Sequence, residues 1–174
     1  MLIGNINSTF WKKFIVTYNP EYSKPSVPFE RRKYFRFEFQ NPLSGEMTIS
    51  EVNGKKVQVG KTPILIDNIG LGGLKIRSNL KSPINMNMKF RICFSLLNEQ
   101  FEVDCQLKWT NEEFLDIYSY GIYFKLSRIT QDRLALIINK LSALRRNNLT
   151  IPDTEFIYED PRTYFRNNLL EKIK

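Results

Sequence analysis

Apolar and polar residues alternate strictly along two neighbouring stretches in the middle of the chain, residues 88–96 and 101–109. Successive side chains of an extended strand point to opposite faces, so this period of two is typical of half-buried β-strands. The short segment Leu97–Gln100 between them predicts a hairpin loop. The residues expected to face the core are Met88, Phe90, Ile92, Phe94 and Leu96 in the first strand and Phe101, Val103, Cys105, Leu107 and Trp109 in the second.

Shorter stretches with the same period lie on both sides of this pair. Asn53-Gly54 favours a type I′ turn and separates Met47–Val52 from Lys55–Val59. The other candidate strands are Tyr34–Phe39 (with Phe35, Phe37 and Phe39 on one face), Pro63–Ile66, Leu74–Arg77 and Tyr118–Leu126. Six or seven short antiparallel strands predict a mainly β fold, either a small β-barrel or a strongly curled sheet.

After the last strand the apolar period changes to 3.6 residues, which predicts a helix. Thr130 is the expected N-cap, and Arg145-Arg146 place cations at the end of the helix, where they suit its dipole. We expect this helix to pack against the sheet through one apolar stripe, formed by Leu134, Ile137, Ile138, Leu141 and Leu144.

The two ends of the chain stand apart from this core. Residues 1–29 combine an apolar and basic cluster at residues 10–16 with a segment containing three prolines, which is typical of an extension and linker. Residues 147–174 form a tail in which Pro161 suits the first position of a short amphipathic helix. The apolar side of that helix (Phe165, Leu169, Leu170 and Ile173) either packs on its own chain or contacts a partner, which leaves a homodimer open.

Charge and composition restrict the classes of function. The 26 Lys and Arg residues outnumber the 18 Asp and Glu residues, giving a net charge of +8 that favours an anionic partner: nucleic acid, a membrane surface or a phosphorylated metabolite. The absence of His removes the commonest general base and metal ligand, which argues against an enzyme or a metal site. Glu112, Glu113 and Asp116 are interpreted as a solvated loop rather than as catalytic carboxylates.

The cysteines and the hydropathy favour a soluble cytoplasmic protein. Strand parity places Cys105 in the core and Cys93 on the opposite face, so a disulfide between them is not expected. No stretch approaches the ~18–20 apolar residues of a membrane span, and no secretory signal is recognisable.

Two short motifs carry the candidate chemistry. Residues 31–36 (Arg-Arg-Lys-Tyr-Phe-Arg) place four cations at the start of a strand, and residues 68–73 (Asn-Ile-Gly-Leu-Gly-Gly) form a glycine turn between two strands. Arg32 and Arg36 share a parity and lie about 13 Å apart if fully extended, a span that suits a ligand with two phosphates. Taken singly, the first motif also fits a solvated strand edge and the second a simple tight turn.

Together the motifs resemble those of PilZ domains, the bacterial receptors for cyclic dimeric GMP (c-di-GMP). Residues 32–36 resemble the Arg-x-x-x-Arg arm of that family, and Asn68-x-Gly70-x-x-Gly73 resembles its Asp/Asn-x-Ser-x-x-Gly turn. The strand that ends in Trp109, the strand at residues 120–124 and the closing helix follow in the family's order. The resemblance covers residues 30–146 and implies a PilZ-type β-barrel with a C-terminal helix.

The resemblance also implies roles for individual residues. Arg32 and Arg36 would contact the phosphates and guanine edges of c-di-GMP, and Asn68 would meet the Watson–Crick edge of a guanine. Gly73 would allow close approach of the backbone. Arg31 stands where a basic residue in this family is associated with binding an intercalated dimer of the ligand.

Gly70 departs from the family pattern, because it replaces the serine of the turn. The missing hydrogen bond is worth ~0.5–1.5 kcal/mol, whereas each contact from a charged Arg is worth ~1.5–3 kcal/mol. We therefore expect Gly70 to weaken the binding of c-di-GMP rather than abolish it.

The resulting expectation is a non-catalytic c-di-GMP receptor that signals by ordering its Arg-rich arm and so changes a surface read by a protein partner. The alternative is a degenerate PilZ-type interaction module that binds no nucleotide, which Gly70 favours. A third hypothesis is a basic β-barrel that binds single-stranded nucleic acid; it needs exposed aromatic platforms, whereas most aromatic residues here follow the inward parity. DNA is not an expected partner.

Overall fold

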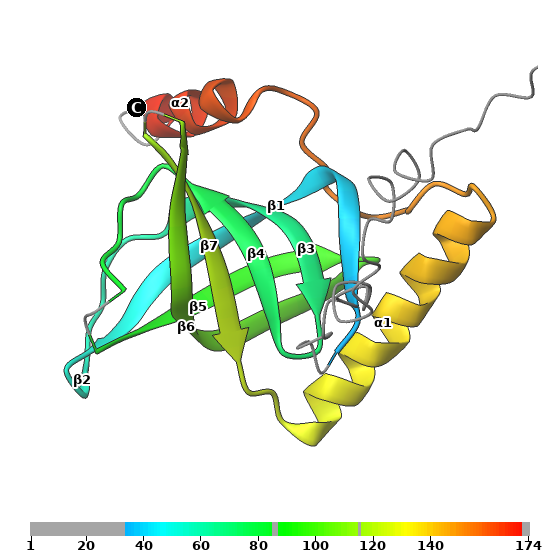
Figure 1. Ribbon diagram of the computed structural model, residues 1–174, viewed down its shortest axis with the longest axis horizontal. Coiled ribbons are helices and arrows are strands. Elements are labelled where there is room, and N and C mark those ends of the chain that lie inside the picture. The colour runs from blue at the N-terminus through cyan, green and yellow to red at the C-terminus, as the bar shows by residue number, and fades with distance from the viewer. Residues whose placement is uncertain (1–33, 85–86, 115, 172–174) are drawn as a thin grey trace, which may run out of the picture. The chain divides into compact units, whose positions relative to one another are not determined.

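The computed structural model describes residues 34–84, 87–114 and 116–171. These ranges hold seven β-strands followed by two helices (Figure 1). The elements are β1 (Arg36–Val52), β2 (Lys55–Lys56), β3 (Thr62–Gly70), β4 (Gly73–Ser78), β5 (Met88–Leu96), β6 (Glu99–Phe114), β7 (Ile117–Phe124), α1 (Arg128–Arg146) and α2 (Pro161–Glu171).

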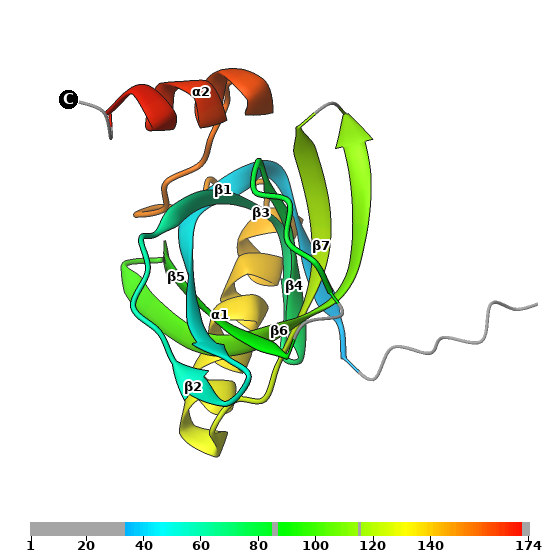
Figure 2. The ribbon, with the colours of Figure 1, turned by 90° about the vertical axis from the view of Figure 1, so that its left-hand side faces the viewer.

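The strands form one antiparallel sheet that closes on itself. Its order is β2-β1-β3-β4-β7-β6-β5, and a further pairing of β1 with β5 joins the two sides. Figure 2 looks through the resulting ring of strands towards α1. Closure leaves few strand edges unpaired, which removes a common site of unwanted association. The expected mainly β fold of six or seven antiparallel strands is confirmed.

The hydrophobic core fills the ring, and α1 closes one end of it (Figure 2). The alternation along β5 and β6 holds for most positions: Phe90 and Ile92 are buried, as are Val103 and Cys105. The helix contributes the same stripe that its period predicts, with Leu134, Ile137, Ile138 and Leu141 all buried. Burying an aliphatic side chain of this size stabilises a fold by ~1.5–3 kcal/mol, so α1 is an integral part of the core.

The cysteines lie as predicted. Cys105 is buried, and burial raises the pKa of its thiol to about 12. Cys93 is half-buried on the opposite face of β5, and both thiols are free.

In two of the hairpins, both residues of a two-residue turn have positive φ. Asn53 (φ 50°) and Gly54 (φ 78°) both adopt the left-handed conformation that a type I′ turn requires, which confirms that prediction. The turn between β5 and β6 consists only of Leu97 and Asn98, whose φ values are also positive, and is shorter than the expected loop. β2 is shorter than expected as well, because pairing with β1 stops after Lys56.

The first strand differs from expectation. Tyr34–Phe39 and Met47–Val52 belong to one long strand, β1, with an irregularity in its pairing to β3 between Glu38 and Leu43. The prediction that Phe35 faces the core is wrong: it precedes β1, and 67% of its surface is exposed.

Trp109 was also wrongly predicted to be inward. The register of β6 on β7 shifts between Leu107 and Trp109, and this bulge turns the indole to the outer face, where 41% of its surface is exposed. A bulge inserts one residue and therefore reverses the parity of everything that follows it.

The N-cap of α1 is Ser127 rather than Thr130. The Ser127 hydroxyl accepts a hydrogen bond from the backbone N–H of Thr130 at 3.2 Å, so Thr130 is the third residue of the helix instead. Thr130 also bonds Ser127 through its own hydroxyl. Both residue types cap helices well, which is why the pattern alone favoured the wrong one.

The segment between the two helices crosses from the β5–β6 turn to β1, and we call residues 153–157 the strap. Its start binds the turn, because the N–H of Asn98 donates to the Asp153 carbonyl and the N–H of Leu97 to the Thr154 hydroxyl. Its end binds the irregular part of β1, where Ser44 donates to Glu155 and Ile157 donates to Pro42. The strap therefore spans the two strands whose pairing closes the ring.

Helix α2 packs on the outer face of the ring (Figure 1). Pro161 is its first residue, and Asp160 caps it by accepting a hydrogen bond from the N–H of Arg162. Tyr164 and Phe165 form a small buried cluster with Leu65 of β3 and Ile117 of β7. The side chains of Leu169 and Leu170, and all of Ile173, lie outside the described residues.

Candidate functional site

The strand register brings the two sequence motifs together on the outer face of the ring. Arg36 of β1 pairs with Gly70 of β3, Gly70 pairs with Gly73 of β4, and Gly73 pairs with Tyr123 of β7. These four residues form one row across four adjacent strands. Arg36 and the glycine turn are therefore direct neighbours, as the motifs together predict.

A second row lies one step further along the same strands. Glu38 pairs with Asn68, Asn68 with Lys75, Lys75 with Gly121, and Gly121 with Trp109. The intervening residues Ile69, Leu74 and Ile122 are buried in the core, so both rows face outward. We call the two rows the outer-face site.

Two of its glycines are required by the fold. A Cβ atom on Gly73 would lie 2.0 Å from the carbonyl oxygen of Ile122, and one on Gly121 would lie 1.9 Å from Nε1 of Trp109. Gly73 thus lets β4 approach β7, and Gly121 lets the indole lie flat across the strand. The resemblance implies that the Gly73 backbone comes close to a ligand. In this structure the close neighbour of Gly73 is strand β7.

Gly70 is covered by the chain that leads into β1. A Cβ atom there would lie 2.8 Å from the carbonyl oxygen of Phe35 and 3.0 Å from Cγ of Arg36. Next to it, the ring of Tyr34 lies against Gly72. The described end of the arm therefore already rests on the glycine turn.

Aromatic and basic side chains border the outer-face site. Tyr123 is 44% exposed and Trp109 is 41% exposed, and the Lys108 ammonium lies 5.1 Å from the centre of the Tyr123 ring. Strand parity alone missed this position of Trp109, because only the pairing of β6 with β7 reveals the bulge. The site thus combines cations with exposed aromatic faces, a pairing that suits anionic ligands carrying flat rings.

Asn68 is almost completely buried, with 5% of its surface exposed. Its Oδ1 accepts a hydrogen bond from the backbone N–H of Lys75 at 3.0 Å, and its Nδ2 donates to both carboxylate oxygens of Glu38 at 2.9 and 3.0 Å. The amide of Asn68 is therefore engaged on both sides by its own protein. Sequence reasoning did not single out Glu38.

The main chain of Glu38 is held by α1. Arg145, in the last turn of the helix, donates a hydrogen bond to the Glu38 carbonyl, and its guanidinium lies 4.0 Å from the centre of the Phe37 ring. The end of α1 thus fixes the strand that carries Arg36 and Glu38.

A network of charged groups lies beside the second row. Asp67 accepts from Arg77 at 2.7 Å and lies 3.4 Å from Lys75, which also lies 3.3 Å from Glu113. Glu113 belongs to β6 and accepts a hydrogen bond from the buried Ser119, so its assignment to a solvated loop is wrong.

The pKa of Glu113 reflects these neighbours. Burial acts to raise the pKa of this carboxyl group, but the hydrogen bond from Ser119 and the positive charges of Lys75 and Arg77 outweigh burial. The net effect is a pKa below the ordinary value of 4.5. Glu113 is therefore held in its ionised form.

Arg31 and Arg32, the other predicted arm residues, lie outside the described residues. Among those that the structure describes, no three His, Cys, Asp or Glu side chains are grouped as metal ligands. Within the same ranges, neither helix has the length and apolar character needed to cross a membrane.

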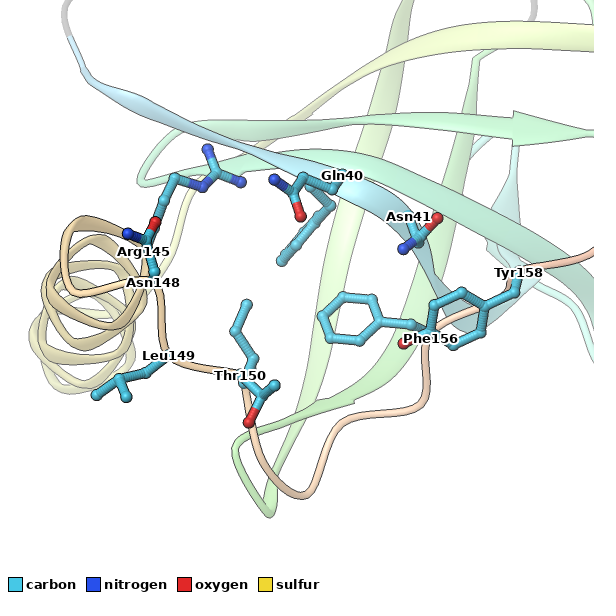
Figure 3. Close-up of a pocket in the computed structure, with 10 residues that line it drawn as sticks. Gln40, Asn41, Arg145, Asn148, Leu149, Thr150, Phe156 and Tyr158 are labelled. Atoms are coloured by element: carbon cyan, nitrogen blue, oxygen red, sulfur yellow. The ribbon is translucent and has the colours of Figure 1, made fainter.

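A separate hollow of about 350 Å³ lies between β1, the end of α1 and the strap (Figure 3). Figure 3 shows Gln40 and Asn41 of β1 on one side, Arg145 on another, and Phe156 and Tyr158 opposite Arg145. None of the described site residues predicted from the sequence lines it. The outer-face site is thus a surface across strands rather than this hollow.

Solved structures with the same fold include three bacterial proteins. The chain aligns with YcgR of Escherichia coli in complex with c-di-GMP (TM-score 0.52, 19% identity, 68% of this chain and 49% of that one). It also aligns with the motility inhibitor MotI (DgrA) of Bacillus subtilis (0.51, 17%, 67% and 54%) and with MrkH of K. pneumonia in complex with c-di-GMP (0.50, 17%, 68% and 55%). The chain therefore spans about half the length of these proteins.

Sequence comparison gives the family. No curated protein matches the chain. The family model of the PilZ domain matches residues 30–141, which is more than half of the 174 residues. With its closed antiparallel sheet, its C-terminal helix and the two motifs side by side on one face, this chain belongs to the PilZ domain family.

Proposed function

We propose that this chain is a non-catalytic receptor for c-di-GMP. The observation that carries the proposal is the register that places Arg36 next to the glycine turn, on a face bordered by exposed aromatic rings. Membership of the PilZ family supports it, as do two neighbours of the same fold that were solved with c-di-GMP. We propose a cytoplasmic protein that does not act on DNA.

The ligand chemistry matches the side chains. Guanidinium groups donate two parallel hydrogen bonds to a phosphate and also stack on flat rings, so Arg32 and Arg36 would hold the phosphates and the guanine edges. Asn68, Gly70 and Gly73 would form the surface below the ligand. Arg31 would engage a second c-di-GMP molecule if the ligand binds as an intercalated dimer.

Signalling would follow from closure of the arm, residues 31–36. Tyr34 and Phe35 rest on the glycine turn, so a ligand that binds between arm and turn changes how the chain enters β1. That change would alter a surface read by a protein partner. The ligand drives it only to the extent that it binds the closed arrangement better than the open one.

The test is calorimetry of the purified chain with c-di-GMP. We expect binding in the micromolar range or tighter, and a loss of roughly tenfold or more when Arg36 or Arg32 is replaced by Ala. Arg91→Ala is the matched control, because Arg91 is a surface arginine on β5 whose partner on β1 is Thr48, far along that strand from Arg36. Binding that is unaffected by Arg36→Ala would refute the assigned role of this residue.

The second candidate function is a PilZ-type interaction module that binds no nucleotide. Gly70 favours it, because the family's serine is missing and the position is covered by Phe35. If calorimetry detects no heat of binding and Tm does not change with tens of micromolar c-di-GMP, the interaction module is favoured over the receptor.

A further inference from the structure

We propose that the carboxylate of Glu38 selects guanine over adenine in the outer-face site, and that Asn68 positions this carboxylate. The inference rests on the proposed function, since it names the residue that determines base specificity at the same site. It departs from the sequence-based expectation, in which Asn68 itself meets the guanine.

The placement of Glu38 is the first argument. Glu38 lies two residues after Arg36 on β1, on the same outward face, and is exposed. It pairs with Asn68 in the register, one row from the Arg36–Gly70 pair. A base whose phosphate is held by Arg36 would lie within reach of this carboxylate.

The orientation of Asn68 is the second argument. Because Oδ1 accepts from the N–H of Lys75, the amide has only one satisfactory orientation, with Nδ2 directed at Glu38. With 5% of its surface exposed, Asn68 has little left to offer a ligand. Its geometry is that of a positioning residue.

The remaining hydrogen-bonding capacity of Glu38 is the third argument. A carboxylate has two oxygens with about four acceptor sites, and the Asn68 Nδ2, at 2.9 and 3.0 Å from the two oxygens, takes the inner site of each and leaves the outer ones. Among the ion pairs of the described residues, Glu38 takes part in none, whereas the neighbouring Lys75 is already paired with Asp67 and Glu113. Glu38 is therefore a fixed, exposed carboxylate with acceptor sites still available.

Guanine matches such a group. Its Watson–Crick edge carries two adjacent donors, the N1–H and the exocyclic N2 amine, and one carboxylate oxygen can accept from both at its outer site. Adenine presents an acceptor at N1, which the carboxylate repels, and it has no amine at C2. A site built to receive donors rejects an analogue that lacks them, because its own polar groups are left unpaired.

The strand that carries Glu38 is held in place. Arg145 donates to its carbonyl and packs on the Phe37 ring, so both the main chain and the side chain of Glu38 are anchored before a ligand arrives. A group anchored in this way loses little freedom on binding, which favours selectivity.

The experiment compares the affinities of cyclic di-GMP, cyclic di-AMP and cyclic di-IMP for the full chain by calorimetry. All three carry the same two phosphates, so the ratio of affinities isolates the base. Inosine keeps the N1–H but lacks the N2 amine, and we expect cyclic di-IMP to bind with intermediate affinity.

Glu38→Gln is the decisive variant. The amide oxygen can still accept from Asn68, but the side chain loses its charge and one acceptor. We expect the preference for cyclic di-GMP over cyclic di-AMP to fall roughly 10- to 100-fold. The matched control is Glu102→Gln, which removes the same charge from an exposed position on β6 and should leave the preference unchanged.

The outcomes separate the two proposals. If the wild-type chain prefers cyclic di-GMP and Glu38→Gln keeps that preference, the inference about Glu38 is wrong while the receptor function stands. The inference is equally wrong if Asn68→Ala abolishes the preference and Glu38→Gln does not. If the wild-type chain binds none of the three dinucleotides, the proposed function fails and the inference fails with it.

Discussion

At the scale of single residues, the outer face of the ring shows how neighbours change the behaviour of a side chain. Glu113 looks like one of several loop carboxylates in the sequence, yet it accepts from a buried serine and faces two cations. Asn68 looks like a ligand contact, yet its amide is used by the protein itself. In both cases the strand partner decides the role, and the partner is distant in sequence.

The charge of Glu113 makes the stability of the fold depend on pH. Its pKa in the folded protein is below the ordinary 4.5, so its contribution is fully present above that value and is lost as the pH falls through the lowered folded pKa. We expect the free energy of unfolding to fall by about 1 kcal/mol more in wild type than in Glu113→Gln between pH 5 and pH 3. Urea titrations across this range measure the difference, and parallel curves for the two proteins would contradict it.

Position 70 tests whether the missing serine limits binding. A side chain there meets the Phe35 carbonyl at 2.8 Å, so Gly70→Ser forces the arm to shift. We expect a loss of stability of about 1 kcal/mol and no tenfold gain in c-di-GMP affinity. Gly60→Ser is the control, because a Cβ at Gly60 meets nothing within 4 Å. If Gly70→Ser binds c-di-GMP more tightly and its free energy of unfolding is unchanged, the prediction is wrong and the arm can move aside without loss of stability.

At the scale of elements, the sequence was informative where a residue's role depends on its own strand or helix. The periods of β5, β6, β7 and α1 predicted most of the core correctly, because burial follows parity within a regular element. The two motifs also drew attention to Arg36 and Gly70, which the register makes neighbours.

The remaining features depend on partners that a period cannot show. Trp109 faces outward because of a bulge between β6 and β7, and Phe35 is exposed because β1 begins after it. Leu65 and Ile117 are buried on the outer face only because α2 covers them. Glu38 belongs to the site because it pairs with Asn68 on the neighbouring strand. No pattern within β1 alone indicates this pairing.

Helix α2 packs on the ring through a cluster separate from the main core, and we expect it to be separable from the ring. Phe165 is 2% exposed, and among the described side chains its cluster contains four buried residues. We expect Phe165→Ala to cost roughly 3 kcal/mol, at the lower end for a buried Phe, and to release α2 while the ring stays folded. Limited proteolysis should then cut after the strap without loss of c-di-GMP binding.

Tyr158→Ala provides the comparison for that experiment. Tyr158 is an aromatic residue of the same tail but is 79% exposed. Its removal should leave the proteolytic pattern of the wild-type chain unchanged. Similar cleavage of both variants would mean that α2 is not held by Phe165.

At the scale of the whole molecule, ligand binding and folding are linked. A ligand that binds only the folded chain stabilises it by about 2.7 kcal/mol at a concentration of 100 times the Kd. For a chain of this size we expect Tm to rise by roughly 5–10 °C with c-di-GMP. Differential scanning calorimetry measures the shift, and the Arg36→Ala variant should show a clearly smaller one at the same ligand concentration.

The strap affects when the ring can close fully during synthesis of the chain. Residues 153–157 form hydrogen bonds with both the β5–β6 turn and β1. The ring therefore lacks these hydrogen bonds until residues 153–157 have left the ribosome. A domain cut at residue 141, where the family match ends, would also lose the last turn of α1, with Arg145 and its bond to Glu38. The shortest fragment that folds like the full chain therefore has to extend beyond the family boundary, at least through the strap.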